Sequence, residues 1–390
     1  MSDETAIDPN LAHRSGVRAV LGLGPLALGV VVAALLLYVG FGGSKTRFDE
    51  FALGAATTPV FARVEDQPIH CMGVEDAEGC VVGALERDMP ATVLWLGNSQ
   101  LHGVNQLEVG QEPAPAILFR RLKSQGLDLV TFSQPNANLQ EHYILFEYLK
   151  ARLAPRVLVL AVVFDDLRET GLRPDVALAL RDPPTIAALR GTGIGRTILA
   201  NNDDQQTVDP DLAGVQQTLQ EHSERALNKW LDRSFPLWEL RPEARGRIVT
   251  GLYNARNTVF GITAQTKRRV IPGRYDANMD AIRALLGSAA SSGIRALVYV
   301  VPLRDDVEIP YEIEDYQRFK KELEQISLEQ GAEFADLEDI VPASFWGQKD
   351  STTVTGGLEM DFMHFQAAGH ERLADAVGEL IESQPASDPT

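Results

Sequence analysis

Residues 93–99 read VLWLGNS, a short apolar run that ends in a glycine, an asparagine and a serine. Such a run is consistent with a strand buried on both faces, and a glycine allows the backbone to turn sharply where the strand ends. We therefore expect Ser99 to stand at the carboxyl end of a strand and to open the following helix. Free N–H groups at a helix start can meet a negative charge that develops on a substrate oxygen.

Strand and helix patterns alternate after this run, which predicts the fold class. The first half comprises a helix at 116–125, a strand at 127–132, a helix at 140–152 and a strand at 157–163. The second half comprises a helix at 278–291, a strand at 296–301, a helix at 314–330 and a short strand at 333–335. Alternation of this kind is typical of parallel strands joined by crossover helices. We expect one α/β catalytic domain over residues 91–382, with a mainly helical insertion at 171–275.

A second stretch with candidate catalytic residues lies near the C-terminus, where residues 361–364 read DFMH. A serine hydroxyl is a poor nucleophile until an imidazole takes its proton, and the imidazole works best when a carboxylate fixes its tautomer. Ser99, His364 and Asp361 are predicted to fill these roles. Residues 369–381 form an apolar helical face, which predicts a closing helix that pins the catalytic loop on the sheet. Chance occurrence of the three residues is the alternative, because spacing does not prove proximity.

These residues carry a resemblance to the SGNH hydrolase superfamily. Gly97-Asn98-Ser99 is similar to the first block of that family, Gly-Asp-Ser, and the run from Asp361 to His364 is similar to its last block, Asp-x-x-His. The match has the expected order and covers about residues 90–380, apart from the middle insertion. The resemblance implies a three-layer, flavodoxin-like α/β fold with a parallel sheet, and an acyl-serine intermediate.

The two middle blocks of the family, which supply oxyanion donors, are matched less closely. Asn136 or Ala137 stands in the place of the glycine of the second block. Asp165 stands where the third block has an asparagine. An ionised carboxylate would repel an oxyanion, so Asp165 is protonated, or it has another role, or Asn138 supplies the donor instead.

Three further residues near these blocks have alternative roles. Arg168 either binds a substrate anion or pairs with the neighbouring Asp165 and Asp166. His102 lies three positions after the serine, and a structural or surface role is favoured over a role in the site. His370 is expected to cap the closing helix or to lie on it.

A long uncharged segment near the N-terminus predicts attachment to a membrane. Residues 19–41 contain no charged side chain and are rich in Leu, Val, Ala and Gly, which suffices for a helix across the hydrocarbon core. The run exceeds an ordinary signal-peptide core and no small-x-small site follows at once, so we favour an uncleaved anchor over a cleaved signal. Residues 1–18 would be a short polar head. Basic residues flank both ends of the span, so their count does not decide its orientation.

The cysteine pair bears on the location of the catalytic domain. Cys71 and Cys80 are the only cysteines and lie close together beyond the predicted span. In an exported segment such a pair is typical of a disulfide, whereas two reduced thiols are the alternative. Together with the family resemblance, this favours a single-pass protein whose catalytic domain faces the periplasm or the cell surface. A tethered cytoplasmic domain is the competing hypothesis.

Charge and composition limit the remaining functions. The formal net charge of −18 argues against nucleic-acid binding, because a phosphate backbone would be repelled. The sequence contains neither a cysteine/histidine metal cluster nor a Gly-rich phosphate loop, so we expect no cofactor and no metal. Residues 42–90 are expected to be a linker or cover segment with few strand signals, and residues 383–390 a flexible tail.

One local charge excess interrupts this acidic composition. Residues 241–269 carry seven basic side chains against one acidic side chain. One interpretation is a helical cap whose basic face pairs with an acidic surface. The other is contact with anionic lipid headgroups or with an acidic polymer.

Two classes of function remain. The first is an envelope enzyme that moves an acyl group, expected to be acetyl, onto or off a cell-envelope polysaccharide. The resemblance favours transfer, since membrane-anchored relatives include proteins of alginate O-acetylation and teichoic-acid D-alanylation, which work beside a membrane-bound O-acyltransferase. The expected partners are therefore the membrane, such an acyltransferase and a polysaccharide. The second class is a non-catalytic scaffold that binds polysaccharide or a membrane partner, which Asp165 supports and the intact Ser/His/Asp set opposes.

Overall fold

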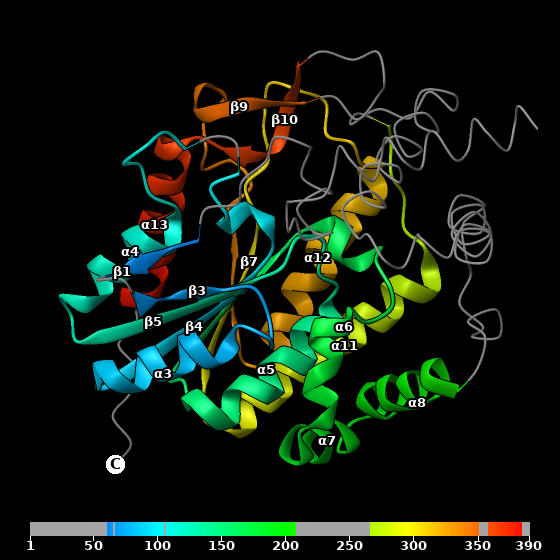
Figure 1. Ribbon diagram of the computed structural model, residues 1–390. Helices are drawn as coiled ribbons and strands as arrows, with labels where there is room; N and C mark the ends of the chain where they lie inside the picture. Colours follow the sequence, from blue (N-terminus) through cyan, green and yellow to red (C-terminus); the bar gives the residue numbers. More distant parts are fainter. Residues whose placement is uncertain (1–60, 65–66, 105–106, 208–265, 351–357, 384–390) are drawn as a thin grey trace, which may run out of the picture. The chain divides into compact units, whose positions relative to one another are not determined.

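The computed structural model describes residues 61–64, 67–104, 107–207, 266–350 and 358–383 (Figure 1). All of them belong to one compact unit. The predicted polar head 1–18, the predicted anchor 19–41 and nearly all of the tail 383–390 lie outside the described residues. Within the described ranges, no helix combines the length and the apolar character needed to cross a membrane.

A six-stranded parallel sheet forms the centre of this unit, in the order β3-β5-β4-β6-β7-β8. Its strands are β3 (His70–Cys71), β4 (Ala91–Gly97), β5 (Leu127–Ser133), β6 (Val157–Val162), β7 (Arg295–Val300) and β8 (Glu333–Asp336). Without the short edge strand β3, the order is 2-1-3-4-5 counted along the chain, which is the flavodoxin-like arrangement. The predicted parallel α/β fold is confirmed.

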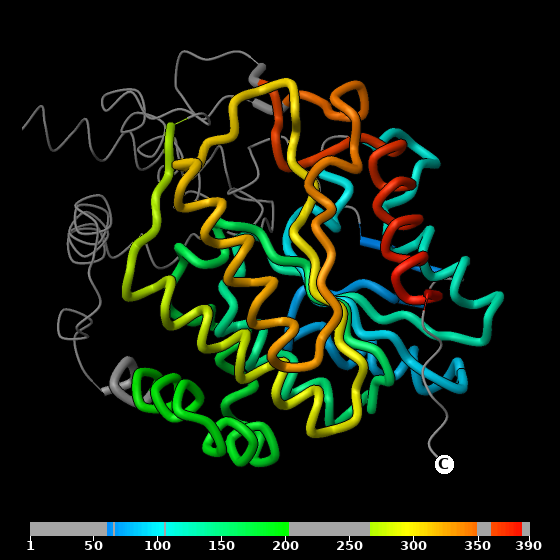
Figure 2. Tube along the Cα trace, turned by 180° about the vertical axis from the view of Figure 1, so that it is seen from behind, coloured from blue at the N-terminus to red at the C-terminus, as the bar shows by residue number. Residues whose placement is uncertain are grey.

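Helices cover both faces of the sheet and make the fold three-layered. One face is covered by α4 (Ala114–Lys123) and α13 (Ala367–Glu382). The other face is covered by α3 (Ala77–Arg87), α5 (Leu139–Leu153), α11 (Pro272–Ser291) and α12 (Ile313–Glu329). In both views α13, in red, and α11, in yellow, lie on opposite sides of the sheet (Figures 1 and 2).

The side chains of β4 show why this strand reads as a continuous apolar run. Val93 and Trp95 pack in the core beneath α4 and α13, whereas Leu94 and Leu96 pack in the core on the opposite face. Successive side chains of a strand point to opposite faces, so a strand buried on both sides needs apolar residues at every position. This packing fixes β4 at the centre of the sheet, with Ser99 just beyond its carboxyl end.

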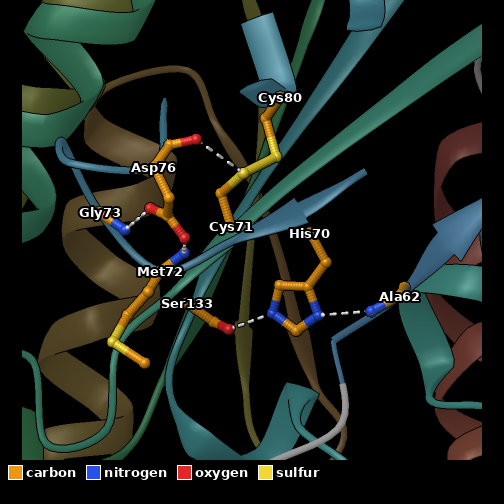
Figure 3. The surroundings of a disulfide bond; sticks show 8 residues. All are labelled: Ala62, His70, Cys71, Met72, Gly73, Asp76, Cys80 and Ser133. Carbon is orange, nitrogen blue, oxygen red and sulfur yellow. Dashed lines mark hydrogen bonds between the residues drawn. A yellow bond between two sulfur atoms is a disulfide. The ribbon is translucent and has the colours of Figure 1, made fainter. Parts of the chain in front are cut away.

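The segment 42–90 is more ordered than the expected linker where the structure describes it. β1 (Arg63–Val64) and β2 (Gln67–Pro68) form an antiparallel pair, and β3 extends the main sheet beside β5. Cys71 and Cys80 form a disulfide that joins β3 to α3 (Figure 3). Of the two alternatives for the cysteines, the disulfide is present. The strands escaped the sequence analysis because two residues are too few to show a period of two.

The predicted insertion 171–275 is helical in its described parts. It contains α6 (Pro174–Ala177), the 3₁₀ turn η3 (Leu178–Arg181), α7 (Pro183–Arg190), α8 (Gly193–Thr207) and the first turn of α11. Residues 208–265 lie outside the described residues, and with them most of the basic stretch 241–269. The three basic residues of that stretch that are described each pair with a carboxylate: Lys267 with Glu308, Arg268 with Asp165 and Arg269 with Glu312. For these three, the structure shows charge pairing.

Helix boundaries differ from the predicted ones by up to six residues. The helix predicted at 278–291 begins at Pro272, and the helix predicted at 116–125 begins at Ala114. Pro272 and Pro115 lie in the first turns of these helices. Proline is suited to this place because its fixed φ is helical and the N–H that it lacks has no partner in a first turn.

Four buried histidines make the stability of this fold depend on pH. Burial lowers the pKa of His102 from 6.5 to about 4 and the pKa values of His142 and His370 to about 3. Burial also lowers the pKa of His70 well below 6.5. Between pH 6.5 and these lower values the unfolded chain binds more protons than the folded chain. Stability from these groups is therefore complete above pH 6.5 and is lost as the pH falls.

We predict that lowering the pH from 7 to 5 reduces the free energy of unfolding by up to about 2 kcal/mol per histidine. The melting temperature should fall accordingly. Thermal unfolding followed by circular dichroism measures the change. Burial raises the pKa of Asp166, which acts in the opposite direction, so a variant must isolate the histidine contribution. His142→Gln removes one titrating ring and should make the fall shallower. An identical pH dependence in this variant would contradict the assignment.

Candidate active site

Ser99, His364 and Asp361 form one chain of hydrogen bonds. His364 Nε2 lies 3.0 Å from Ser99 Oγ, and His364 Nδ1 lies 2.8 Å from Asp361 Oδ2. Asp361 Oδ1 also accepts the backbone N–H groups of Met363 and His364, at 2.9 and 3.1 Å. A carboxylate on Nδ1 leaves Nε2 able to take the serine proton. The structure thus brings the predicted Asp361–His364 pair to Ser99, which lies 265 positions before His364.

Ser99 stands just beyond the carboxyl end of β4, as predicted. It is the first residue of a 3₁₀ turn, η1 (Ser99–Leu101), and Asn98 Oδ1 accepts the N–H of Gln100 at 3.0 Å. The α-helix expected to open at Ser99 is absent, since α4 begins only at Ala114. A short turn still leaves N–H groups exposed at its start, so the chemical argument for this position holds.

The structural reason for a glycine at position 97 differs from the expected one. It lies within β4, and its φ is not in the left-handed region. A Cβ atom at this position would lie 2.6 Å from Leu101 Cδ1 and 3.3 Å from Ala161 Cβ. Glycine is therefore required because η1 folds back closely onto the strand, and not because the backbone needs an unusual angle.

The Asp-x-x-His motif lies on a strand instead of the expected loop. β10 (Leu358–Phe365) pairs antiparallel with β9 (Trp346–Asp350), and their register shifts between Met360 and Phe365. In a regular strand, residues three apart point to opposite faces, so the irregularity is what lets Asp361 and His364 meet. The predicted closing helix is present as α13, whose buried apolar face packs beside the strand end.

Gln100 links the two parts of the site and was not predicted from the sequence. Its Nε2 donates to the carbonyl oxygens of Met363 at 3.0 Å and Pro302 at 2.8 Å. Met363 directly precedes His364, so this buried amide ties the serine turn to the histidine strand. The only signal in the sequence is a large polar residue directly after the serine.

Two backbone N–H groups beside the nucleophile are candidates for oxyanion donors. Neither the Ser99 N–H nor the Asn136 N–H has a hydrogen-bond partner in the part of the chain that the structure describes. Gln134 N–H donates to Gly97 O at 3.2 Å, so the loop that carries Asn136 lies beside the serine turn. Asn136 has a φ of 54°, in the left-handed region that favours glycine and that asparagine tolerates best among other residues.

The side chains considered as oxyanion donors are engaged elsewhere. Asn138 caps α5, because its Oδ1 accepts the Glu141 N–H at 3.0 Å while its Nδ2 donates to Gly171 O at 2.8 Å. The alternative in which Asn138 supplies the donor is therefore not supported. The carboxylate of Asp165 has another role, since it accepts hydrogen bonds from Arg168, Arg268 and Tyr311.

Arg168 takes the simpler of its two expected roles. Its Nη1 donates to Asp165 Oδ1 at 3.3 Å, and its Nε donates to the carbonyl of Arg269 at 2.9 Å. Pairing with Asp165 is thus observed, and the guanidinium ties the turn after β6 to the chain before α11.

His102 is structural, as favoured by the sequence analysis. It is buried, and its Nε2 lies 2.7 Å from Ser133 Oγ. His70 contacts the same hydroxyl from β3, at 2.5 Å (Figure 3). His370 lies in the first turn of α13, where its Nδ1 accepts the Ala114 N–H at 3.2 Å. These rings join neighbouring elements around the site. Among the described residues, no group of histidine, cysteine and carboxylate side chains could hold a metal ion.

The strand order and the Ser-His-Asp chain agree with the fold and the catalytic residues expected from the sequence. The nucleophile follows the first strand of a 2-1-3-4-5 parallel sheet, and the Asp-x-x-His pair immediately precedes the last helix. The resemblance to the SGNH hydrolase superfamily implied a flavodoxin-like sheet and a Ser-His-Asp set, and the structure contains both.

Comparisons with known proteins give the following similarities. No protein-family model matches the chain, and no curated protein matches it in sequence. Among solved structures it is similar to TesA, with 13% identity, 75% of this chain and 98% of that chain covered, and a TM-score of 0.34. A catalytic mutant of Axe2, an acetylxylan esterase from Geobacillus stearothermophilus, has 11% identity, coverage of 75% and 95%, and a TM-score of 0.34. An alpha/beta hydrolase from the metagenome of Lake Arreo has 11% identity, coverage of 74% and 94%, and a TM-score of 0.35.

We predict that Ser99→Ala and His364→Ala each lower esterase turnover by a factor of about 10³ or more, because the triad acts as a unit. Labelling by a fluorophosphonate probe, read by mass spectrometry, should disappear in Ser99→Ala. Ser133→Ala is the matched control, since that serine also contacts two histidines but is buried at the end of β5. Labelling that survives in Ser99→Ala and is lost in Ser133→Ala would place the nucleophile at Ser133.

Proposed function

We propose that this protein is a membrane-anchored acyl-serine enzyme that transfers an acyl group, most simply acetyl, to or from a saccharide of the cell envelope. The observation that carries the acyl-ester chemistry is the Ser99–His364–Asp361 chain, with its 3.0 and 2.8 Å contacts. The saccharide, the anchor and the direction of transfer are inferred from the sequence, and each needs its own test.

The reaction would proceed through an ester of Ser99. Ser99 Oγ attacks the carbonyl carbon of an acyl ester while its proton passes to His364 Nε2, and Asp361 stabilises the imidazolium. The carbonyl oxygen becomes an oxyanion facing the N–H groups of Ser99 and Asn136. When the tetrahedral intermediate collapses, the C–O bond to the leaving alcohol breaks and the alcohol takes the proton from His364.

The second half of the reaction, in which the acyl-serine ester is cleaved, decides between transfer and hydrolysis. His364 removes a proton from an incoming hydroxyl, whose oxygen attacks the acyl carbon and releases Ser99. Water gives hydrolysis, and a sugar hydroxyl gives acyl transfer, with the same enzyme residues in both. The support for transfer is the resemblance to anchored envelope acyltransferases, which work beside a membrane-bound O-acyltransferase.

An anchored location outside the cytoplasm is supported by two features, of which the first supports the anchor and the second supports export. The uncharged run 19–41 has the length and composition of a membrane span. The disulfide between Cys71 and Cys80 is characteristic of proteins from oxidising compartments.

A non-catalytic scaffold is the alternative, and one observation favours it. The carboxylate of Asp165 occupies the position where a side-chain amide donor is expected, and it binds two arginines and a tyrosine. No donor for an oxyanion comes from that position. The scaffold would keep the fold and bind a polysaccharide or a membrane partner without turnover.

We predict that the full-length protein in detergent hydrolyses p-nitrophenyl acetate slowly and releases p-nitrophenol faster when an oligosaccharide from the native envelope is added. A bound sugar hydroxyl has a high effective concentration near the acyl-enzyme and competes with water. Mass spectrometry should detect the acetylated saccharide, and Ser99→Ala should abolish it. Rapid hydrolysis without an acylated saccharide would identify a hydrolase, and no turnover together with no probe labelling would identify a scaffold.

We further predict that a reporter active only outside the cytoplasm is active when fused after Thr390. Peptide maps of the protein isolated from cells, run without reductant, should join Cys71 and Cys80, because an oxidising compartment favours the disulfide. Cys80→Ser is the control that must lose the joined peptide. An inactive reporter on a fusion protein that is present in full length would rule out export.

A further inference from the structure

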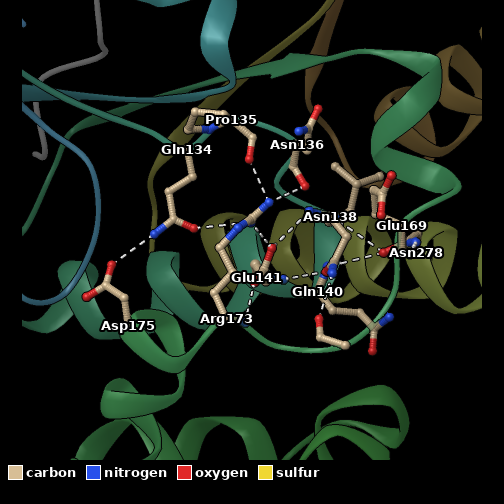
Figure 4. A network of polar contacts seen from close by, with 12 residues as sticks. Gln134, Pro135, Asn136, Asn138, Gln140, Glu141, Glu169, Arg173, Asp175 and Asn278 are labelled. Carbon is tan, nitrogen blue, oxygen red and sulfur yellow. Dashed lines mark hydrogen bonds and ion pairs between the residues drawn. The ribbon is translucent and has the colours of Figure 1, made fainter. Parts of the chain in front are cut away.

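Arg173 binds the loop that carries the Asn136 N–H, one of the two candidate oxyanion donors. This residue belongs to the insertion and directly precedes α6, yet its guanidinium reaches the turn after β5 (Figure 4). Its Nη2 donates to the carbonyl oxygens of Pro135, at 2.6 Å, and Asn136, and its Nη1 donates to Gln134 Oε1 at 3.3 Å. Three consecutive residues of the loop are therefore held by one cation.

The hydrogen bond from Arg173 to the Pro135 carbonyl determines where the Asn136 N–H points. The Pro135 carbonyl and the Asn136 N–H belong to the same peptide unit, and no cis peptide bond is present in the described residues. In a trans peptide the C=O and N–H bonds point in opposite directions. Since the oxygen is held toward Arg173, the N–H is directed away from it. A cation on the carbonyl also polarises the amide, which makes its N–H a stronger donor.

The hydrogen bonds from Arg173 also hold Asn136 in a left-handed backbone conformation, which residues other than glycine disfavour. A residue other than glycine in the left-handed region is strained, and such conformations persist only when surrounding contacts hold them. Hydrogen bonds from a charged donor are stronger than those between neutral groups. The two bonds from Arg173 to the carbonyls on either side of the Asn136 Cα therefore hold both peptide planes in place.

Arg173 is itself anchored from behind by Glu141, which is 3% exposed. The Glu141 carboxylate accepts the Arg173 backbone N–H at 2.7 Å and pairs with its Nη1. The same carboxylate accepts the Asn138 N–H at 3.1 Å and completes the capping box of α5. The orientation of the guanidinium is thus fixed by a helix start, which itself lies against the sheet.

We propose that Arg173 is a positioning residue that presents the Asn136 N–H to the oxyanion formed at Ser99. This rests on the proposed function, and it names a group that acts through the loop without touching the substrate. Arg173 affects the transition state, in which the oxyanion exists, much more than the bound ester. Its loss should lower kcat and leave KM nearly unchanged.

The test uses the full-length protein and two variants. In Arg173→Met both carbonyl bonds are lost, and we expect kcat for p-nitrophenyl acetate to fall about 100-fold with KM within about threefold of the wild-type value. The inhibition constant of an alkylboronic acid, whose adduct on Ser99 is tetrahedral, should rise by a comparable factor. Arg173→Lys keeps the ion pair with Glu141 but cannot bridge both carbonyls, so an intermediate loss of about tenfold is expected even if the methionine variant fails to fold.

Arg152→Met is the matched control, because Arg152 lies at the other end of α5 and pairs with Asp182, away from the loop. Its kinetics should equal those of the wild type. An unchanged kcat in Arg173→Lys would overturn the proposal, and so would a loss that appears in KM and melting temperature but not in boronate affinity. Absence of probe labelling on Ser99 in the wild type would instead overturn the proposed function, and the positioning role with it.

Discussion

The side-chain amide of Gln100 holds together two segments that lie 263 residues apart in the chain. It donates to the carbonyl before His364 and to a carbonyl that follows β7, from a position where water does not compete. Leaving these carbonyls unpaired in the interior would cost roughly 1–3 kcal/mol each, so the pairing is strongly enforced. The 3.0 Å contact between Ser99 and His364 is thereby a property of the folded sheet and does not depend on bound substrate.

The sheet makes this arrangement possible because parallel strands bring their carboxyl ends to one edge. Ser99 follows β4, Asn136 follows β5 and Asp165 follows β6, although long helices separate these strands in sequence. Ligand sites in open α/β sheets lie at this edge, where the strand order changes direction. Here the change falls at β4, which carries the nucleophile and pairs with β5 on one side and β6 on the other.

Features that depend on short-range pattern could be predicted from the sequence, whereas features that depend on distant contacts could not. Apolar runs and helical periodicity gave the order of strands and helices, and residue chemistry gave Ser99, Asp361 and His364. The capping box that occupies Asn138 was readable, because a glutamate follows three positions later at Glu141. The irregularity in β10 and the links made by Gln100 and Arg173 arise only when the chain is folded, since their partners lie on other elements.

Arg173 belongs to the inserted segment, yet its side chain binds the loop that follows β5 of the central sheet. The insertion and the core therefore do not behave as separable modules. Exchanging this segment for that of another protein, or trimming it to obtain a minimal domain, would remove the support of a loop that lies at the nucleophile. Substitution of Arg173 is accordingly restrained by the geometry of the core.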